Sequence, residues 1–172
     1  LLMRHLLKKT TDKKQRAYLI NHFMDQFKGT VYRQTMFAEF ELAMGKMAES
    51  GQALTADALC QKYHALNKLY FGPDMVSDDQ IALEWARIPH FFYNYYVFQY
   101  ATGFSAAVAI ANRILKEGAP AVADYKKFLS GGCSTDPISL LKIAGVDMSS
   151  PLPVQQAMET FNQLLDEFES LL

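Results

Sequence analysis

The segment from Ile88 to Ala111 constrains the fold of this chain more than any other stretch. Its sequence, IPHFFYNYYVFQYATGFSAAVAIA, has no Asp, Glu, Lys or Arg and contains four tyrosines. Pro89 disfavours helical backbone in the residue before it, so we expect a helix to begin between His90 and Tyr96 and to end near Gly118. A helix with so few charged positions is expected to be buried on several sides.

Three interpretations of this segment compete. It is long enough to cross a bilayer, whose apolar core needs about 20 residues, but its proline, histidine, amides and hydroxyls are costly to place in lipid. It is also consistent with a protein core in which buried tyrosines hydrogen-bond through their tips. In the third interpretation a histidine and two tyrosines line a cleft, where neutral phenols donate hydrogen bonds to a bound carbonyl or oxyanion.

Helices are expected over most of the remaining chain, because apolar residues recur at helical spacing between capping and breaking residues. The predicted helices are Leu1–Leu7, Thr10–Lys28, Val31–Ser50, Thr55–Leu69, Ile81–Arg87, Ala119–Leu129, Ile138–Ala144 and Pro151–Leu171. We expect Gly29 and Thr30 to separate two of them, and the small residues Gly103, Ala107 and Ala111 to let another backbone approach closely. No run alternates as a half-buried strand does, so the predicted fold class is all-α.

Composition narrows the range of partners. The 172 residues are 50% hydrophobic and 20% charged, with a formal net charge of −1, which gives no steering toward nucleic acid or acidic lipid. Cys60 and Cys133 are the two cysteines, and their number and separation favour reduced thiols over a disulfide. We therefore expect a cytoplasmic protein with no nucleic-acid partner and no membrane partner.

Four sequence blocks, in this order along the chain, resemble a known family. They are FKGTVYRQTMFAEFE at Phe27–Glu41, LNKLYFGP at Leu66–Pro73, EWARIPHFFYNYYVFQYATGFSAA at Glu84–Ala107 and ISLLKIAGVDMSSP at Ile138–Pro151. Together they resemble the C-terminal part of the oligoendopeptidase F group, zinc metallopeptidases related to thimet oligopeptidase.

The resemblance implies a function and a set of site residues. It implies a mostly helical endopeptidase of short peptides, with zinc held by a His-Glu-x-x-His helix and a later Glu. The histidine and paired tyrosines of the family's substrate face fall here on His90, Tyr93 and Tyr100, which are the candidate catalytic residues. These three and Tyr96 are the candidate substrate-binding residues. The position of the second tyrosine is open between Tyr93, Tyr95 and Tyr96.

The metal motif of that family is missing from this chain. The histidines His5, His22, His64 and His90 include no pair at the spacing of helical zinc ligands. We therefore expect no metal ligand here, and zinc in the full-length protein held by residues outside this chain. Residues 1–172 are expected to be the C-terminal part of the peptidase catalytic domain, a fragment lacking the upstream zinc-binding helix, inactive alone and prone to self-association.

A second class of function stays open from the sequence. An aromatic helical face that grips a peptide or a partner helix, without catalysis, would explain the same residues. Within the first block, Arg33 is expected to pair with a glutamate and to support the site from beneath.

Overall fold

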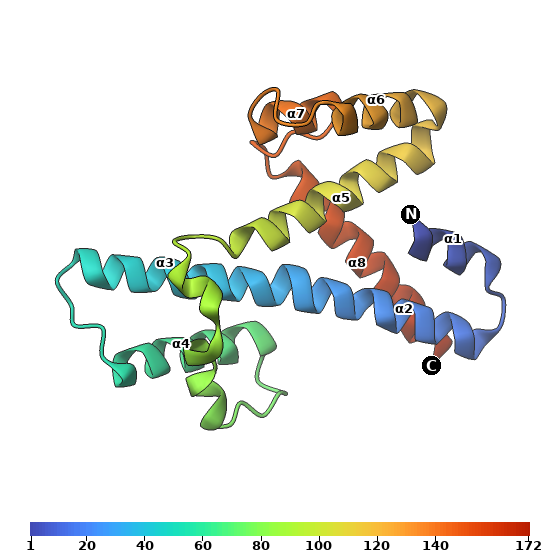
Figure 1. Cartoon of the computed structure of the whole chain (residues 1–172). Helices are drawn as coiled ribbons and strands as arrows, with labels where there is room; N and C mark the ends of the chain where they lie inside the picture. Colours follow the sequence, from blue (N-terminus) through green and yellow to red (C-terminus); the bar gives the residue numbers. More distant parts are fainter. The chain divides into compact units, whose positions relative to one another are not determined.

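The computed structural model describes residues 1–172, and its regular elements are all helical (Figure 1). In chain order they are α1 (Leu2–Lys9), α2 (Lys13–Phe27), η1 (Lys28–Tyr32), α3 (Arg33–Glu49), α4 (Ala56–Phe71), η2 (Gln80–Arg87), η3 (Pro89–Phe92), α5 (Phe98–Glu117), α6 (Ala119–Ser130), α7 (Pro137–Ile143) and α8 (Leu152–Leu171). The predicted all-α class is confirmed.

Side-chain caps fix several of the predicted helix starts. The carboxylate of Asp136 accepts a hydrogen bond from the backbone N–H of Ser139 at 2.9 Å, and the hydroxyl of Thr55 accepts one from Ala58 at 3.2 Å. Asp12 caps α2 in the same way. Each cap satisfies an N–H that has no partner within its helix, so these short polar residues mark the starts correctly.

The predicted break at Gly29 and Thr30 is wrong. Helical backbone continues through both residues, as the π-helix η1, which bridges α2 and α3. A glycine inside a helix costs about 1 kcal/mol, whereas burying one large apolar side chain contributes about 1.5–3 kcal/mol. Val31, inside η1, is 7% exposed, so its burial outweighs the weak local preference.

The start of the central helix also differs from the prediction. α5 begins at Phe98, beyond the expected window, because the preceding residues form the short 3₁₀ helix η3 and then a turn. In that turn Asn94 and Tyr95 have φ angles of 55° and 63°, a left-handed conformation that no helix tolerates. The end of α5 is as predicted, at Gly118 with φ 70°.

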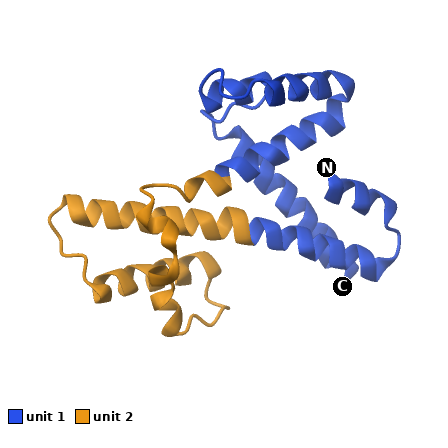
Figure 2. Ribbon diagram, in the orientation of Figure 1, with its two compact units in different colours: residues 1–28, 102–172 blue, residues 29–101 orange.

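The chain divides into two compact units (Figure 2). Unit 1 comprises residues 1–28 and 102–172, and unit 2 comprises residues 29–101. Helix α5 therefore begins in unit 2 and continues in unit 1.

Unit 1 is built around Phe27. Its ring, fully buried, lies 4.9 Å from the ring of Phe104 on α5 and 5.6 Å from the ring of Phe161 on α8. These aromatic contacts join α2, α5 and α8, and an ion pair between Arg16 and Glu167 adds to the contact of α2 with α8.

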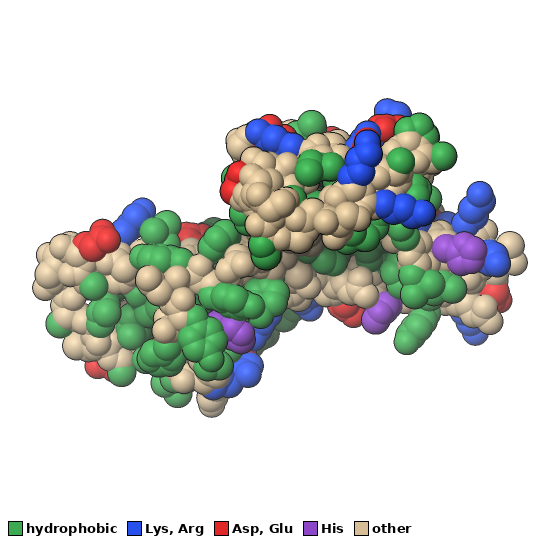
Figure 3. Space-filling model, turned by 45° about the horizontal axis from the view of Figure 1, so that its top comes forward, with side chains coloured by type: hydrophobic (Ala, Val, Ile, Leu, Met, Phe, Trp, Pro, Cys, Tyr) green, Lys and Arg blue, Asp and Glu red, His purple; other side chains and the backbone are tan.

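The small-residue stripe of α5 is not covered by backbone in this chain. A Cβ added to Gly103 would meet no atom within 4 Å, and Ala107 is exposed. Both residues line a hollow of about 440 Å³ whose other walls are largely apolar. The predicted close approach of another backbone is therefore wrong for residues 1–172. Apolar and aromatic side chains also reach the surface elsewhere, as the face in Figure 3 shows.

The core of unit 2 is centred on Phe40. The ring of Phe40 on α3 lies 5.2 Å from that of Tyr63 on α4 and 5.3 Å from that of Phe91 in η3. Ile88 and Val97, at the two ends of the segment that precedes α5, are both buried in the same core. The core thus anchors both ends of this segment and Phe91, and residues 92–96 are left exposed.

Candidate functional site

Four of the predicted site residues lie together in unit 2. The ring of His90 lies 5.7 Å from that of Tyr93, 5.5 Å from that of Tyr96 and 6.0 Å from that of Tyr100. Tyr96 stacks on His90 with an interplanar angle of 21°, whereas the other two rings meet His90 nearly edge-on. We call His90, Tyr93, Tyr96 and Tyr100 the His–Tyr cluster.

The route to this arrangement differs from the one that the sequence indicated. Tyr93 was expected to share a helical face with Tyr100, two turns away, but Tyr93 precedes α5 and lies in the turn after η3. Tyr93 and Tyr96 flank the left-handed pair Asn94 and Tyr95, and the rings of both lie near the ring of His90. A turn brings these residues together. The predicted helical spacing from Tyr93 to Tyr100 does not exist, because Tyr93 lies outside α5.

The hydroxyl of Tyr100 has two polar neighbours inside the cluster. It lies 3.4 Å from Nε2 of His90, where the donor depends on the histidine tautomer. A hydrogen bond with Tyr96 raises the pKa of Tyr100 above its ordinary value of 10.0, and partial burial and the charge of a Tyr96 phenolate act in the same direction. Tyr100 is therefore a neutral phenol at neutral pH and retains its proton for donation.

The cluster is open to solvent. Tyr93 is 60% exposed, and Tyr96 and Tyr100 are each 38% exposed. Buried tyrosines of an ordinary core have far smaller exposed fractions, so these side chains do not fill the interior of residues 1–172. Their hydroxyls can instead be reached by a ligand.

Tyr95 takes a different direction from the rest. Its backbone N–H donates a hydrogen bond to Oε1 of Glu41 on α3 at 2.7 Å, and its hydroxyl lies against Gly45, one turn further along α3. Among the three tyrosines that the sequence left open, Tyr93 and Tyr96 therefore make ring contacts with His90, and Tyr95 packs on α3 instead. Glu41 and Gly45 were not among the predicted site residues, although a glutamate beside the apolar stripe of α3 is a signal that sequence reasoning could have used.

Four residues before Ile88, the buried carboxylate of Glu84 is the centre of an ion cluster that supports the same segment. The carboxylate of Glu84 in η2 accepts hydrogen bonds from Arg33, from Arg87 and from the hydroxyl of Tyr63. Arg33 was expected to pair with a glutamate, and it does so with Glu84, which lies 51 positions further along the chain. This ion cluster fixes η2, and η2 leads directly into η3 and His90.

The ionisation of this cluster follows from its contacts. Burial alone would raise the pKa of Glu84, but the hydrogen bonds from Arg33 and Tyr63 outweigh it and hold that pKa below its ordinary value of 4.5. For Tyr63, burial and the neighbouring carboxylate both raise the pKa far above the ordinary range. Glu84 is thus charged and Tyr63 neutral at neutral pH.

No group of three His, Cys, Asp or Glu side chains in residues 1–172 is placed to hold a metal ion. His22 lies beside Gln26, with 3.3 Å between their nitrogens, and His64 lies 3.1 Å from the backbone oxygen of Ser77. The residues present therefore do not fit a zinc site.

A membrane-spanning helix was one interpretation of the segment from Ile88 to Ala111. None of the helices has the length and apolar character that crossing a bilayer requires.

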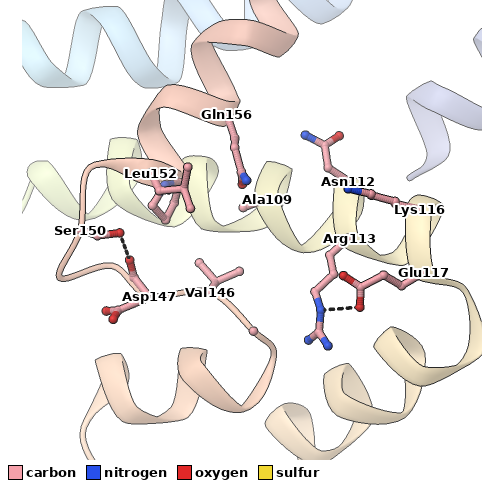
Figure 4. A pocket seen from close by; sticks show the side chains of 12 residues that line it. Ala109, Asn112, Arg113, Lys116, Glu117, Val146, Asp147, Ser150, Leu152 and Gln156 are labelled. Carbon is pink, nitrogen blue, oxygen red and sulfur yellow. Dashed lines mark hydrogen bonds and ion pairs between the residues drawn. The ribbon is translucent and has the colours of Figure 1, made fainter.

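Unit 1 has a hollow of about 320 Å³ of its own, lined by both polar and apolar side chains (Figure 4). Its charged lining residues are Arg113, Lys116, Glu117 and Asp147. The guanidinium of Arg113 is already engaged with Glu117 at 2.9 Å, Asp124 at 2.8 Å and the backbone oxygen of Ala144 at 2.8 Å. A ligand would have to compete with these partners, so the His–Tyr cluster is the better candidate site.

Comparison with known proteins identifies the family to which this helical chain belongs. Residues 1–160 match peptidase family M3, and the chain belongs to that family. It is 55% identical to the oligopeptidase PepF of Bacillus subtilis over 172 residues, which are all of this chain and 26% of that protein. It is 44% identical to the group B oligopeptidase PepB of Streptococcus agalactiae, again over its full length and 29% of the relative.

A solved structure shows the same fold. The crystal structure of oligoendopeptidase-F from Enterococcus faecium superposes with a TM-score of 0.95 at 48% identity, covering 99% of this chain and 33% of that one. The chain thus spans between about a quarter and a third of the length of the relatives that it matches.

Proposed function

We propose that residues 1–172 are the C-terminal part of the catalytic domain of a zinc endopeptidase that hydrolyses short peptides. In this proposal the zinc ligands lie outside this chain, and unit 2 supplies the face that binds the substrate and stabilises its oxyanion. Membership of family M3 and the names of the relatives, oligopeptidase and oligoendopeptidase, support the reaction class. Their greater length is consistent with a metal site elsewhere.

One observation carries the proposal, namely the exposed His–Tyr cluster with its protonated phenol. When a peptide bond is attacked, its carbonyl oxygen gains negative charge, and a donor directed at that position is worth most in the transition state. Tyr100 keeps its proton at neutral pH because the ordinary pKa of a phenol, 10.0, is far above 7 and is raised further here, so it can donate to that oxygen. A carboxylate in the same place would repel it.

The other members of the cluster have distinct roles in this proposal. His90, whose Nε2 lies 3.4 Å from the Tyr100 hydroxyl, orients that hydroxyl and serves as a second donor when its own Nε2 carries the proton. The exposed hydroxyls of Tyr93 and Tyr96 bind backbone carbonyls of the peptide on either side. Binding to backbone groups requires no particular substrate side chain.

The decisive experiment is Tyr100→Phe in the full-length protein, because it removes one oxygen and leaves the ring in place. Loss of one oxyanion donor lowers turnover by about a hundredfold to a thousandfold, with a smaller effect on KM. Tyr18→Phe is the matched control, since Tyr18 is 72% exposed and belongs to unit 1. Near-normal turnover in Tyr100→Phe, with only a lowered melting temperature, would reject the proposal and favour a non-catalytic peptide-binding face.

A further inference from the structure

The turn between Tyr93 and Tyr96 is held in a strained backbone conformation. Asn94 and Tyr95 have φ angles of 55° and 63°, and neither is glycine. Such a conformation persists only where the surrounding structure enforces it, and it is found preferentially at functional sites. Two consecutive residues of this kind, directly between two members of the His–Tyr cluster, therefore need an enforcing contact.

Glu41 supplies the first contact. This residue of α3 is only 6% exposed, yet its carboxylate Oε1 accepts a hydrogen bond from the backbone N–H of Tyr95 at 2.7 Å. The two residues are 54 positions apart, so this is a tertiary contact and not part of the local turn. A short hydrogen bond shielded from solvent is suited to holding a strained backbone, because water does not compete for it.

Gly45 supplies the second contact, one helical turn further along the same face of α3. A Cβ at position 45 would overlap the hydroxyl oxygen of Tyr95 and would lie 3.5 Å from the ring carbon that bears it. The absence of a side chain at Gly45 thus creates the space in which the Tyr95 ring lies. The backbone and the ring of Tyr95 are held by two residues of one rigid helix.

We propose that Glu41 and Gly45 are positioning residues, which hold Tyr95 so that the flanking Tyr93 and Tyr96 lie around His90. Neither residue has to touch substrate. The inference rests on the proposed function, since it assigns the cluster to peptide binding and catalysis. Tyr95 is adjacent to Tyr96 and two residues from Tyr93, so a shift of the Tyr95 backbone moves the backbone of both.

The alternative is that Glu41 and Gly45 merely stabilise the fold, and Gly45→Ala separates the two ideas. Alanine is a better helix former than glycine, so the substitution favours α3 itself. The added methyl nevertheless forces the Tyr95 hydroxyl to retreat by about 1 Å to reach ordinary van der Waals separation. A positioning role predicts lower turnover without lower stability, whereas a purely structural role predicts that turnover follows stability.

The test uses the full-length, zinc-loaded protein and four variants. We expect Glu41→Ala and Gly45→Ala to lower kcat, by up to about a hundredfold when the shift at Tyr95 moves the His–Tyr cluster by about 1 Å. Glu41→Gln keeps an oxygen that accepts the Tyr95 N–H, so it should restore most of the turnover lost in Glu41→Ala. Gly29→Ala is the matched control, because that glycine is also helical but a Cβ there meets nothing within 4 Å.

Hydrogen exchange of the segment containing Tyr95 provides a readout that does not depend on activity. Exchange there should be faster in Glu41→Ala than in the wild-type protein or Glu41→Gln, with exchange in α4 unchanged. Unchanged exchange at Tyr95 in Glu41→Ala would show that Glu41 does not hold the Tyr95 backbone. Faster exchange with normal kcat in both Glu41→Ala and Gly45→Ala would overturn the positioning role. Near-normal turnover in Tyr100→Phe would reject the proposed function without changing the exchange result. Rejection of the proposed function and rejection of the positioning role can therefore be distinguished.

Discussion

Replacing Glu84 tests how strongly the buried ion cluster stabilises unit 2. The side chain of Glu84 is 7% exposed, and its carboxylate accepts hydrogen bonds from Arg33, Arg87 and Tyr63. Glu84→Ala removes the acceptor for all three and leaves the guanidinium of Arg33, whose side chain is 29% exposed, without its buried counter-ion. We expect a large loss of stability, because an uncompensated charge beside a core is costly.

The magnitude follows from the exposure of each partner. Hydrogen bonds to a charged group contribute about 1.5–3 kcal/mol each, and those from Arg33 and Tyr63 are shielded from solvent. The side chain of Arg87 is 70% exposed, so its ion pair adds less than about 1 kcal/mol. Partial hydration of Arg33 in the variant offsets some of the loss. The expected decrease in unfolding free energy is therefore about 3–4 kcal/mol.

Thermal unfolding of the 172-residue chain, followed by circular dichroism, measures this effect. A loss of about 3–4 kcal/mol corresponds to a Tm lowered by roughly 10 °C for a protein of this size. Glu159→Ala is the control, since Glu159 is exposed on α8 and should change Tm very little. A decrease below about 1 kcal/mol for Glu84→Ala would refute the view that this cluster stabilises unit 2.

The same cluster predicts how stability depends on pH. The pKa of Glu84 is lower in the folded chain than its ordinary value of 4.5. Near these pH values the folded chain therefore binds fewer protons than the unfolded chain does. Its contribution is fully present above about pH 4.5 and is lost as the pH falls through the lower, folded pKa. Glu84→Gln should flatten this acid limb, and an acid limb equal to that of the wild type would show that other carboxylates dominate.

Three further predictions concern other parts of the chain. Tyr96→Phe should lower the pKa of Tyr100 toward 10.0, as seen by absorbance titration of tyrosinate, and an unchanged pKa would place the origin of the shift elsewhere. Asp136→Ala removes the cap of α7 and should cost about 1 kcal/mol in urea unfolding, with Asp166→Ala as an exposed control that leaves stability unchanged. The isolated chain should purify without stoichiometric zinc by metal analysis and self-associate in size-exclusion chromatography, and tight zinc at one ion per chain would show that its histidines do form a site.

The helices were predictable to the extent that local chemistry sets them. Thr55 and Asp136 cap helices where the sequence indicated, because a cap is a contact across three residues. The predicted break at Gly29 was wrong because the free-energy cost of one glycine in a helix is smaller than the gain from burying Val31 nearby. The predicted start of α5 was wrong because residues 94 and 95 form a left-handed turn. A contact distant in sequence holds that turn, the hydrogen bond from Tyr95 to Glu41, and no local pattern encodes it.

The candidate site shows the same division. His90, Tyr93, Tyr96 and Tyr100 are close in sequence, so any compact arrangement of that segment brings them near one another. Their supports are not close in sequence: the partner of Arg33 is 51 positions away, and that of Glu41 is 54 positions away. From one sequence the members of the His–Tyr cluster could be named as candidates, but the distant residues that contact their segment could not.

The position of Trp85 gives unit 2 a natural optical reporter. It is the single tryptophan of the chain, its indole N–H donates to Sγ of Cys60 at 3.4 Å, and its ring centroid lies 6.3 Å from that of Phe40. Tryptophan fluorescence therefore monitors the melting of residues 29–101 alone, whereas far-ultraviolet ellipticity averages over both units. Coincident transitions by the two signals would mean that the units unfold as one cooperative body, and separated transitions would give each unit its own stability.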